Sequence, residues 1–261
     1  MFRKITLAFV AAMSASSAWA TVTFDFHTAI PSFGNAYGNS ASFDGSDGAG
    51  GVQVTVTSFS LTGAGTTFET AKTSGTVNLG LNVCNQLEGL NCLLPQHQID
   101  NDFGNGTFGA VDFILLQFNA PVSITSVTLS TVGDGNIFGT TDTDASFWQG
   151  NVASGLNLAT ACGGACTQAS LAGLGFAVNG NSDAAPISNN SGLRTFNVGG
   201  GAYTSFLISA RTGAGADSAL DYFKLYDAVT ESSTTPEPGT FGLGAAALIG
   251  LVALRRRALT R

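Results

Sequence analysis

The sequence predicts an all-β protein, a β-sandwich of jelly-roll type. Hydrophobic residues make up 44% of the 261 residues, whereas charged residues make up only 10%, against roughly 25% in an average soluble protein. Glycine is abundant, at 34 residues. Along the body of the chain, β-branched and aromatic residues recur with a period of two, and no segment carries the apolar stripe of an amphipathic helix. These three observations favour strands joined by tight turns.

Seven segments of strand length carry the period-two pattern. In chain order they are residues 21–26, 52–59, 111–118, 122–130, 193–198, 203–210 and 220–229. The third is almost continuously apolar and is predicted to be a central strand, whereas the fourth alternates and is predicted to face solvent on one side. Asn119, Ala120 and Pro121 predict a turn between them. Residues 33–51 and 177–192 are rich in Gly, Ser and Asn and predict long loops on one rim.

The first twenty residues predict a secretory signal helix. Two basic residues precede an apolar run, and the small residues Ala18 and Ala20 form an A-x-A cleavage pattern. Thr21 is then the first residue of the exported chain. We expect three parts in all: a signal peptide at residues 1–20, a β-sandwich body at 21–230, and a linker with a sorting signal at 231–261.

The body is strongly acidic. Residues 21–235 contain four basic and sixteen acidic side chains, a net charge of −12, whereas the whole chain has a formal charge of −7. A body with this net negative charge lacks the excess of basic side chains that binding to nucleic acid or to an anionic lipid surface requires. We therefore expect no nucleic-acid partner.

The four cysteines are predicted to form disulfides, because an exported protein meets an oxidising compartment. Three pairings are open to four cysteines, and the sequence alone does not choose among them. We favour the local pairs Cys84–Cys92 and Cys162–Cys166, since two glycines let the chain turn sharply inside the second pair. A four-thiolate zinc site is the alternative, although neither spacing is of the C-x2-C type.

No motif of a known catalytic type occurs, and we predict that the protein is not an enzyme. The nucleophile elbow, the zinc-protease motif and the phosphate-binding loop are all missing from the sequence. Carboxylates and amides do gather in loops, and the calcium candidates among them are Asp134, Asn136, Asp142 and Asp144. A structural calcium ion is one interpretation of this cluster, and capping of turns by the same side chains is the favoured one. No other cofactor is expected.

Aromatic residues and carboxylates leave two further functions open. Phe147, Trp148 and Tyr203 would form a sugar-stacking platform if they were exposed, which would make the body a carbohydrate-binding module, whereas burial would place them in the core. A secreted hydrolase would need two carboxylates across a cleft, and their spacing in the sequence selects no pair.

The C-terminal segment predicts a transmembrane helix that is short for a permanent anchor. Residues 240–254 are uncharged and mostly apolar, and as a helix they would span about 22 Å against a hydrocarbon core of about 30 Å. Arg255, Arg256 and Arg257 follow. Basic residues stay on the cytoplasmic side, so the body would lie across the membrane from them.

Pro236, Glu237 and Pro238, followed by this apolar segment and the three arginines, resemble the PEP-CTERM sorting signal of proteins handled by exosortase in Gram-negative bacteria. The resemblance implies that a membrane-embedded cysteine protease recognises the Pro-Glu-Pro motif and cleaves nearby. The protein would then be anchored in the inner membrane only transiently, before release or transfer to the cell exterior. Such proteins commonly accompany exopolysaccharide and biofilm production.

Residues 97–137 and 203–229 are also similar to segments of exosortase-dependent surface proteins. This likeness concerns strands and loops, and it implies the sandwich fold and a surface location but no catalytic residue. We therefore expect an exported protein of the cell surface or extracellular matrix, structural or adhesive in type. Exosortase is its expected processing partner, and extracellular polysaccharide is a second expected partner.

Overall fold

A computed structural model of the chain describes residues 19–48, 51–62, 67–90, 98–101, 110–131, 143–162, 168–181, 192–211 and 221–233. Thr21–Glu231 form one compact unit, and the architecture below is that of this unit. The remaining residues, Met1–Ala20 and Ser232–Arg261, are grouped apart from it. No helix among the described residues has the length and apolar character needed to cross a membrane, and residues 240–254 lie outside them.

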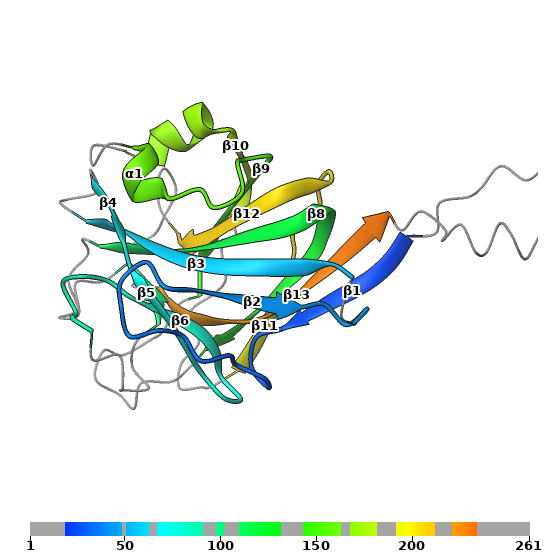
Figure 1. Ribbon diagram of the computed structural model, residues 1–261, viewed down its shortest axis with the longest axis horizontal. Helices are drawn as coiled ribbons and strands as arrows, with labels where there is room; N and C mark the ends of the chain where they lie inside the picture. The colour runs from blue at the N-terminus through cyan, green and yellow to red at the C-terminus, as the bar shows by residue number, and fades with distance from the viewer. Residues whose placement is uncertain are drawn as a thin grey trace, which may run out of the picture. The chain divides into compact units, whose positions relative to one another are not determined.

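Strands dominate the described residues, which confirms the all-β prediction (Figure 1). The strands are β1 (Trp19–Asp25), β2 (Ser40–Asp44), β3 (Gln53–Thr62), β4 (Thr67–Thr70), β5 (Lys72–Thr76), β6 (Gly80–Cys84), β7 (Ile99–Asp100), β8 (Val111–Thr131), β9 (Ala145–Gly150), β10 (Phe176–Asn181), β11 (Gly192–Asn197), β12 (Tyr203–Ala210) and β13 (Tyr222–Ser233). Two short helices, α1 (Leu158–Ala161) and the 3₁₀ helix η1 (Gln168–Leu174), lie between β9 and β10.

The predicted turn at Asn119, Ala120 and Pro121 is wrong, because β8 runs through it as one strand of 21 residues. The chain bends there without reversing. Before the bend β8 pairs with β3 and β12, and after it mainly with β11 and β13. Asn119 and Pro121 are exposed at the bend, where the missing N–H of proline costs no ladder hydrogen bond. The Asn119 side chain accepts a hydrogen bond from the Gln53 amide at 2.9 Å.

Each of the two predicted long loops contains a strand. Within residues 33–51 the chain forms β2, and β10 covers the start of 177–192. β2 pairs with β3 in register, and its Phe43 is 6% exposed, packed in the core. The Ser and Gly content of residues 33–51 masked the strand whose Phe43 packs in the core, whereas in β10 Val178 is exposed and the strand is defined by its pairing with β9.

The strands form two layers that β8 joins. One layer has the hydrogen-bonded order β10-β9-β12-β8-β3-β2, and we call it the upper layer. The other contains β11, β8, β13, β6 and β5, with β1 and β7 paired to β13. The main core lies between them and draws on both, with Val54, Ile114 and Phe206 from the upper layer and Leu81, Val127 and Phe223 from the other. The jelly-roll connectivity stays a prediction.

A second apolar cluster lies on the outer face of the upper layer, the face that points away from the main core. The chain between β9 and β10, with α1 and η1, covers this face; Figure 1 shows it on the side of β12 and β3 opposite β13 and β1. We call it the outer cluster, and its buried members are Phe59, Leu61, Phe68, Phe113, Leu115, Trp148, Val152, Leu158, Leu171, Phe176 and Leu207. Alternate residues of β3 and β8 thus enter different cores, because side chains along a strand point to opposite faces.

Candidate functional site

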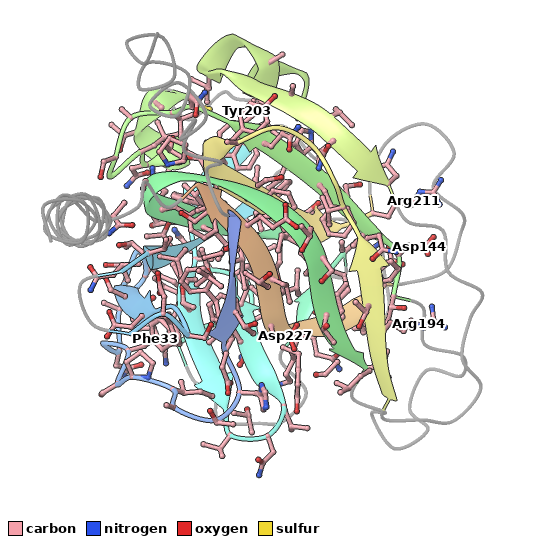
Figure 2. All side chains as sticks on the ribbon, turned by 90° about the vertical axis from the view of Figure 1, so that its right-hand side faces the viewer. Phe33, Asp144, Arg194, Tyr203, Arg211 and Asp227 are labelled. Atoms are coloured by element: carbon pink, nitrogen blue, oxygen red, sulfur yellow. The ribbon has the colours of Figure 1, made fainter. Side chains whose placement is uncertain are left out.

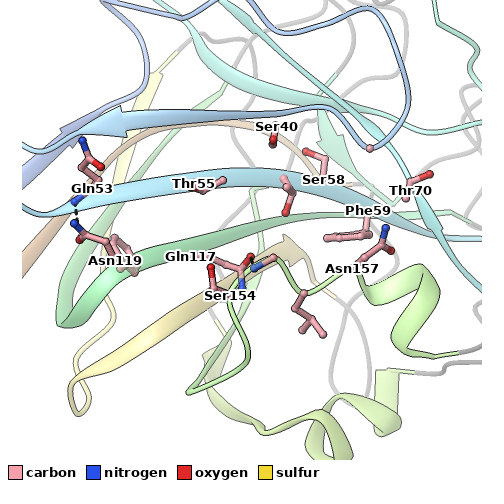
Figure 3. Close-up of a pocket in the computed structure, with 15 residues that line it drawn as sticks. Ser40, Gln53, Thr55, Ser58, Phe59, Thr70, Gln117, Asn119, Ser154 and Asn157 are labelled. Carbon is pink, nitrogen blue, oxygen red and sulfur yellow. Dashed lines mark hydrogen bonds between the residues drawn. The ribbon is translucent and has the colours of Figure 1, made fainter.

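A groove of about 370 Å³ lies on the outer face of the upper layer, beside the outer cluster (Figure 3). Its floor comes from β3, through Gln53, Thr55 and Thr57, and from the end of the first half of β8, through Gln117 and Asn119. The chain just before α1 provides the opposite wall, at residues 154–157. The groove therefore forms where the cover of the outer face stops.

The alternation along β3 explains why this floor is polar. Val54 and Val56 are fully buried in the main core, so Thr55 and Thr57, which follow them in alternation, point to the outer face. Phe59, two residues further on, is 2% exposed and belongs to the outer cluster. The strand changes from threonine to phenylalanine at the point where α1 begins to cover it.

Gln117 fixes the wall of the groove. Its side-chain Nε2 donates a hydrogen bond to the Ala153 carbonyl at 2.8 Å, and its Oε1 accepts one from the Gly155 amide at 3.1 Å. Gly155 has a φ of +73°, a backbone conformation that residues other than glycine adopt only at a cost in free energy. Asn157 then caps α1, since its Oδ1 accepts a hydrogen bond from the Thr160 amide at 3.1 Å. The wall is held by these polar contacts together with Leu156, which packs against the outer cluster.

The groove presents hydroxyl and amide groups and no charge. None of its described lining residues is acidic, basic or a histidine. Thr55 Oγ1 and Ser42 Oγ lie 3.1 Å apart and share one hydrogen bond. Thr57 Oγ1 is buried and has no hydrogen-bond partner among the described residues. This arrangement suits recognition of a neutral polar molecule and contains no group that would act as a general acid or base near pH 7.

Phe147 and Trp148 do not form a sugar-stacking platform, so that interpretation is wrong for them. Both are 4% exposed. Phe147 faces the main core, with its ring centroid 5.9 Å from that of Phe206, and Trp148 packs in the outer cluster, 5.8 Å from Phe113. Tyr203 is half-buried at the start of β12. The core reading of these aromatics is confirmed for the first two.

Asp144, one of the calcium candidates, lies in a buried polar cluster with Arg211 (Figure 2). Its Oδ2 accepts a hydrogen bond from Arg211 at 3.1 Å, and its backbone amide donates to Asp221 Oδ1 at the same distance. Asp221 also accepts a hydrogen bond from Asn101 Nδ2 at 2.8 Å. A carboxylate beside a guanidinium is already neutralised, and this cluster ties β7, β9, β12 and β13 together at one end of the layers.

The other calcium candidates, Asp134, Asn136 and Asp142, lie outside the described residues. Within the part of the chain that the structure describes, no group of three or more His, Cys, Asp or Glu side chains could hold a metal ion. The calcium interpretation for those three residues stays a prediction.

Asp112 is a fully buried carboxyl on the face of β8 opposite the outer cluster. Burial raises the pKa of Asp112 well above its usual value, and the negative charge of Glu88 raises that pKa further. Asn85 Nδ2 donates a long hydrogen bond of 3.5 Å to Asp112 Oδ1, while Oδ2 has no hydrogen-bond partner among the described residues. The raised pKa means that folding favours the neutral acid.

The predicted cysteine pairs fall partly outside the described residues. Cys84 ends β6 and is fully buried, and Cys162 caps the C-terminus of α1. Neither is a free cysteine. Cys92 and Cys166 lie outside the described residues, so the pairing stays a prediction.

The predicted N-terminal and C-terminal signals also lie largely outside the described residues. Ala20 and Thr21 lie in β1, next to the predicted cleavage point, whereas Ala18 is not among the described residues. The predicted sorting residues, Pro236, Glu237, Pro238, Arg255, Arg256 and Arg257, are likewise outside the described part.

The residues of the groove were not predicted as a site. The alternating threonines of VQVTVT indicated a strand with one polar face. Nothing in the sequence indicated that Gln117, sixty residues later, would lie beside that face and hold a loop against it. The pairing of β3 with β8, which sets Thr55 opposite Gln117, brings them together.

Comparison with known proteins identifies the tail. The PEP-CTERM protein-sorting motif matches residues 234–257, and no curated protein matches the chain. The match confirms the resemblance on which the tail was interpreted. The chain thus carries a PEP-CTERM sorting signal, which marks an exported protein that is anchored in the membrane transiently and processed by an exosortase.

Proposed function

We propose that the body is a structural and adhesive component of the cell surface or extracellular matrix, delivered there when exosortase removes the C-terminal signal. The observation that carries this proposal is the sorting motif at residues 234–257, and the predicted N-terminal export signal agrees with it. An association with exopolysaccharide and biofilm follows from the same resemblance. The sandwich of the body, joined by one long bent strand, suits a protein that must persist outside the cell.

The groove supports a binding role over a catalytic one. Its described lining offers hydroxyl and amide groups without a titratable side chain, and acid–base catalysis needs such a side chain within reach of the reacting bond. We propose that the protein is not an enzyme. The groove favours a second candidate function, that of a carbohydrate-binding module. No observation in the described part of the chain favours a secreted hydrolase.

Mass spectrometry of the exported protein tests the processing. We expect the mature chain to begin at Thr21 and to lack Arg255, Arg256 and Arg257. Replacing Pro236 and Glu237 by alanine should retain the tail and keep the protein in the inner membrane, while the matched change Arg261→Ala should not. Recovery of the arginines on the wild-type protein at the cell surface would refute the proposal.

We propose local disulfides, Cys84–Cys92 and Cys162–Cys166, for the exported protein. Their support is the predicted export and the observation that neither described cysteine is free. Peptide mapping under non-reducing conditions should find each pair within one short peptide. A peptide joining the 84–92 segment to the 162–166 segment would exclude this connectivity.

A further inference from the structure

We propose that the groove formed by β3, β8 and the loop before α1 binds an extended, uncharged polysaccharide chain through hydrogen bonds. The inference deepens the proposed adhesive function and rests on it for the place where the protein would meet such a polymer. The ligand class is inferred from the groove itself, and none of the residues that line the groove belongs to the sorting signal at residues 234–257.

An unused hydroxyl in the groove is the first argument. Thr57 lines the groove, and its Oγ1 is buried without a hydrogen-bond partner among the described residues. A buried polar atom of this kind costs roughly 1–3 kcal/mol when it stays unsatisfied. The neighbouring hydroxyls Thr55 Oγ1 and Ser42 Oγ satisfy each other. Because Oγ1 is buried, a ligand hydroxyl would supply the missing partner once the Thr57 side chain rotates about χ1 to turn Oγ1 into the groove.

The charge of the groove selects the ligand class. Its described lining carries no charged side chain, so it offers no ion pair to an acidic sugar or a phosphate. The body around it has a net charge of −12, which repels polyanions at low ionic strength. Hydroxyl and amide groups, by contrast, both donate and accept hydrogen bonds, as sugar hydroxyls do. A neutral glycan matches both properties.

The shape of the groove suits a chain rather than a compact molecule. Its floor follows β3 from Gln53 to Phe59, six residue steps or about 20 Å. The volume of about 370 Å³ is near the lower end of the range for ligand sites, roughly 300–1,000 Å³. Asn119, hydrogen-bonded to the Gln53 amide, marks one end in Figure 3, and Asn157 marks the other. Several sugar units would lie along the strand.

The aromatic residues of the groove limit the expected affinity. Phe59 and Phe118 line it, yet they are only 2% and 7% exposed, so neither presents a ring face to stack on a sugar. Binding then relies on hydrogen bonds exchanged with water, each of small net value. We expect a dissociation constant of about 1 mM for one oligosaccharide, with tight retention only when many copies meet one polymer.

Calorimetric titration of the exported protein with neutral cello-, xylo- and malto-hexaose, and with the polyanion hexagalacturonate, tests the inference. We expect saturable binding of at least one neutral probe and none of the polyanion. Thr57→Val removes the unused hydroxyl at nearly constant volume and should weaken that binding about fivefold. Thr23→Val, at a partly exposed strand threonine on β1, is the matched control and should not change it.

Ser154→Leu gives a second, independent variant. Ser154 is exposed on the loop wall, so a larger side chain there should obstruct the groove and abolish binding without disturbing a strand. Preferred binding of hexagalacturonate, no binding of any neutral probe, or unchanged affinity in both groove variants would overturn the inference. Because the titration uses purified protein, these outcomes are independent of whether mass spectrometry finds the tail removed.

Discussion

The outer face of the upper layer has two halves that differ in what covers them. In one half, residues of β3 and β8 such as Phe59 and Phe113 are buried beneath α1 and η1. In the other, Thr55 and Thr57 of the same strand remain half-exposed and line the groove. Both halves share the same backbone ladder, so the side-chain chemistry decides whether the face becomes core or binding surface.

The comparison shows that a change of residue type along one strand can leave one part of the strand packed in a core and another part lining a groove. Apolar residues recruit a cover because burying them is favourable, at roughly 25 cal/mol per Å². Hydroxyl residues gain little from a cover and leave the face open to a ligand. Gln117 stands at the border and holds the edge of the cover in place. The predictions below test this division, from the largest expected effect to the smallest.

Trp148→Ala should be the most damaging change, because Trp148 is 4% exposed within the outer cluster. Deleting a buried tryptophan leaves a cavity, and we expect the free energy of unfolding to fall by about 3–5 kcal/mol. Urea unfolding followed by circular dichroism measures it. Trp148→Phe is the control and should retain most of the stability. A loss below about 0.5 kcal/mol for the alanine variant would mean that the covered half is not a core.

Gln117→Ala tests the border between the halves. It leaves the Ala153 carbonyl and the Gly155 amide without their side-chain partner, and we expect a loss of about 1–3 kcal/mol in unfolding free energy. Hydrogen exchange of the Gly155 amide should also become faster. The control is Gln53→Ala, whose side chain is exposed and donates to Asp44 at 2.6 Å. Equal effects of the two changes would show that Gln117 does not hold the wall.

Asp112→Asn tests the opposite face of the same strand. Since burial raises the pKa of Asp112, the folded state keeps its proton at pH values where the unfolded chain, with a pKa of about 3.9, has lost it. Its contribution to stability is therefore complete below about pH 4 and is lost as the pH rises through the folded-state pKa. Asparagine does not titrate, so the variant should avoid this loss.

We expect Asp112→Asn to be more stable than the wild type at pH 8 by about 1 kcal/mol or more, with the difference shrinking toward pH 4. Thermal unfolding at several pH values measures this trend. Asp44→Asn, at an exposed position on β2, makes the same substitution outside the core and is the control. A wild-type protein that grows more stable between pH 4 and pH 8 relative to the variant would contradict the buried, neutral Asp112.

Asn157→Ala removes the cap of α1 beside the groove. Its Oδ1 accepts the Thr160 amide, and losing an N-cap typically costs about 1 kcal/mol. Asn157→Asp keeps an accepting oxygen and should preserve the stability. Chemical unfolding of the two variants side by side decides the point, and equal stability for both would show that the cap is dispensable.

Thr57→Val should have the smallest effect on folding. Since Thr57 Oγ1 has no partner among the described residues, replacing it by a methyl group should leave the melting temperature unchanged or raise it, by about 2–4 °C for each kcal/mol of relieved cost. A marked drop would show that the hydroxyl already bonds within the protein. The open half would then have no unsatisfied group to offer a ligand.

Much of the fold could be predicted from the period-two pattern, as β3 and β12 illustrate. The errors have physical causes. At Asn119 and Pro121 the sequence carries turn residues, yet the strand only bends there, because both halves of β8 find partner strands in different layers. The burial of Trp148 depended on Leu158 and Leu171, residues that a short helix and a 3₁₀ helix place over it.

The sequence by itself determined how this protein is sorted, because a sorting signal is recognised as a linear order of motif, apolar segment and arginines at residues 234–257. It also determined the all-β class, since strand alternation is a local property. Only the tertiary structure decided which polar face stays open. That outcome depends on the register of β3 against β8 and on how far the chain around α1 extends over them, both of which are set by contacts between residues distant in the sequence.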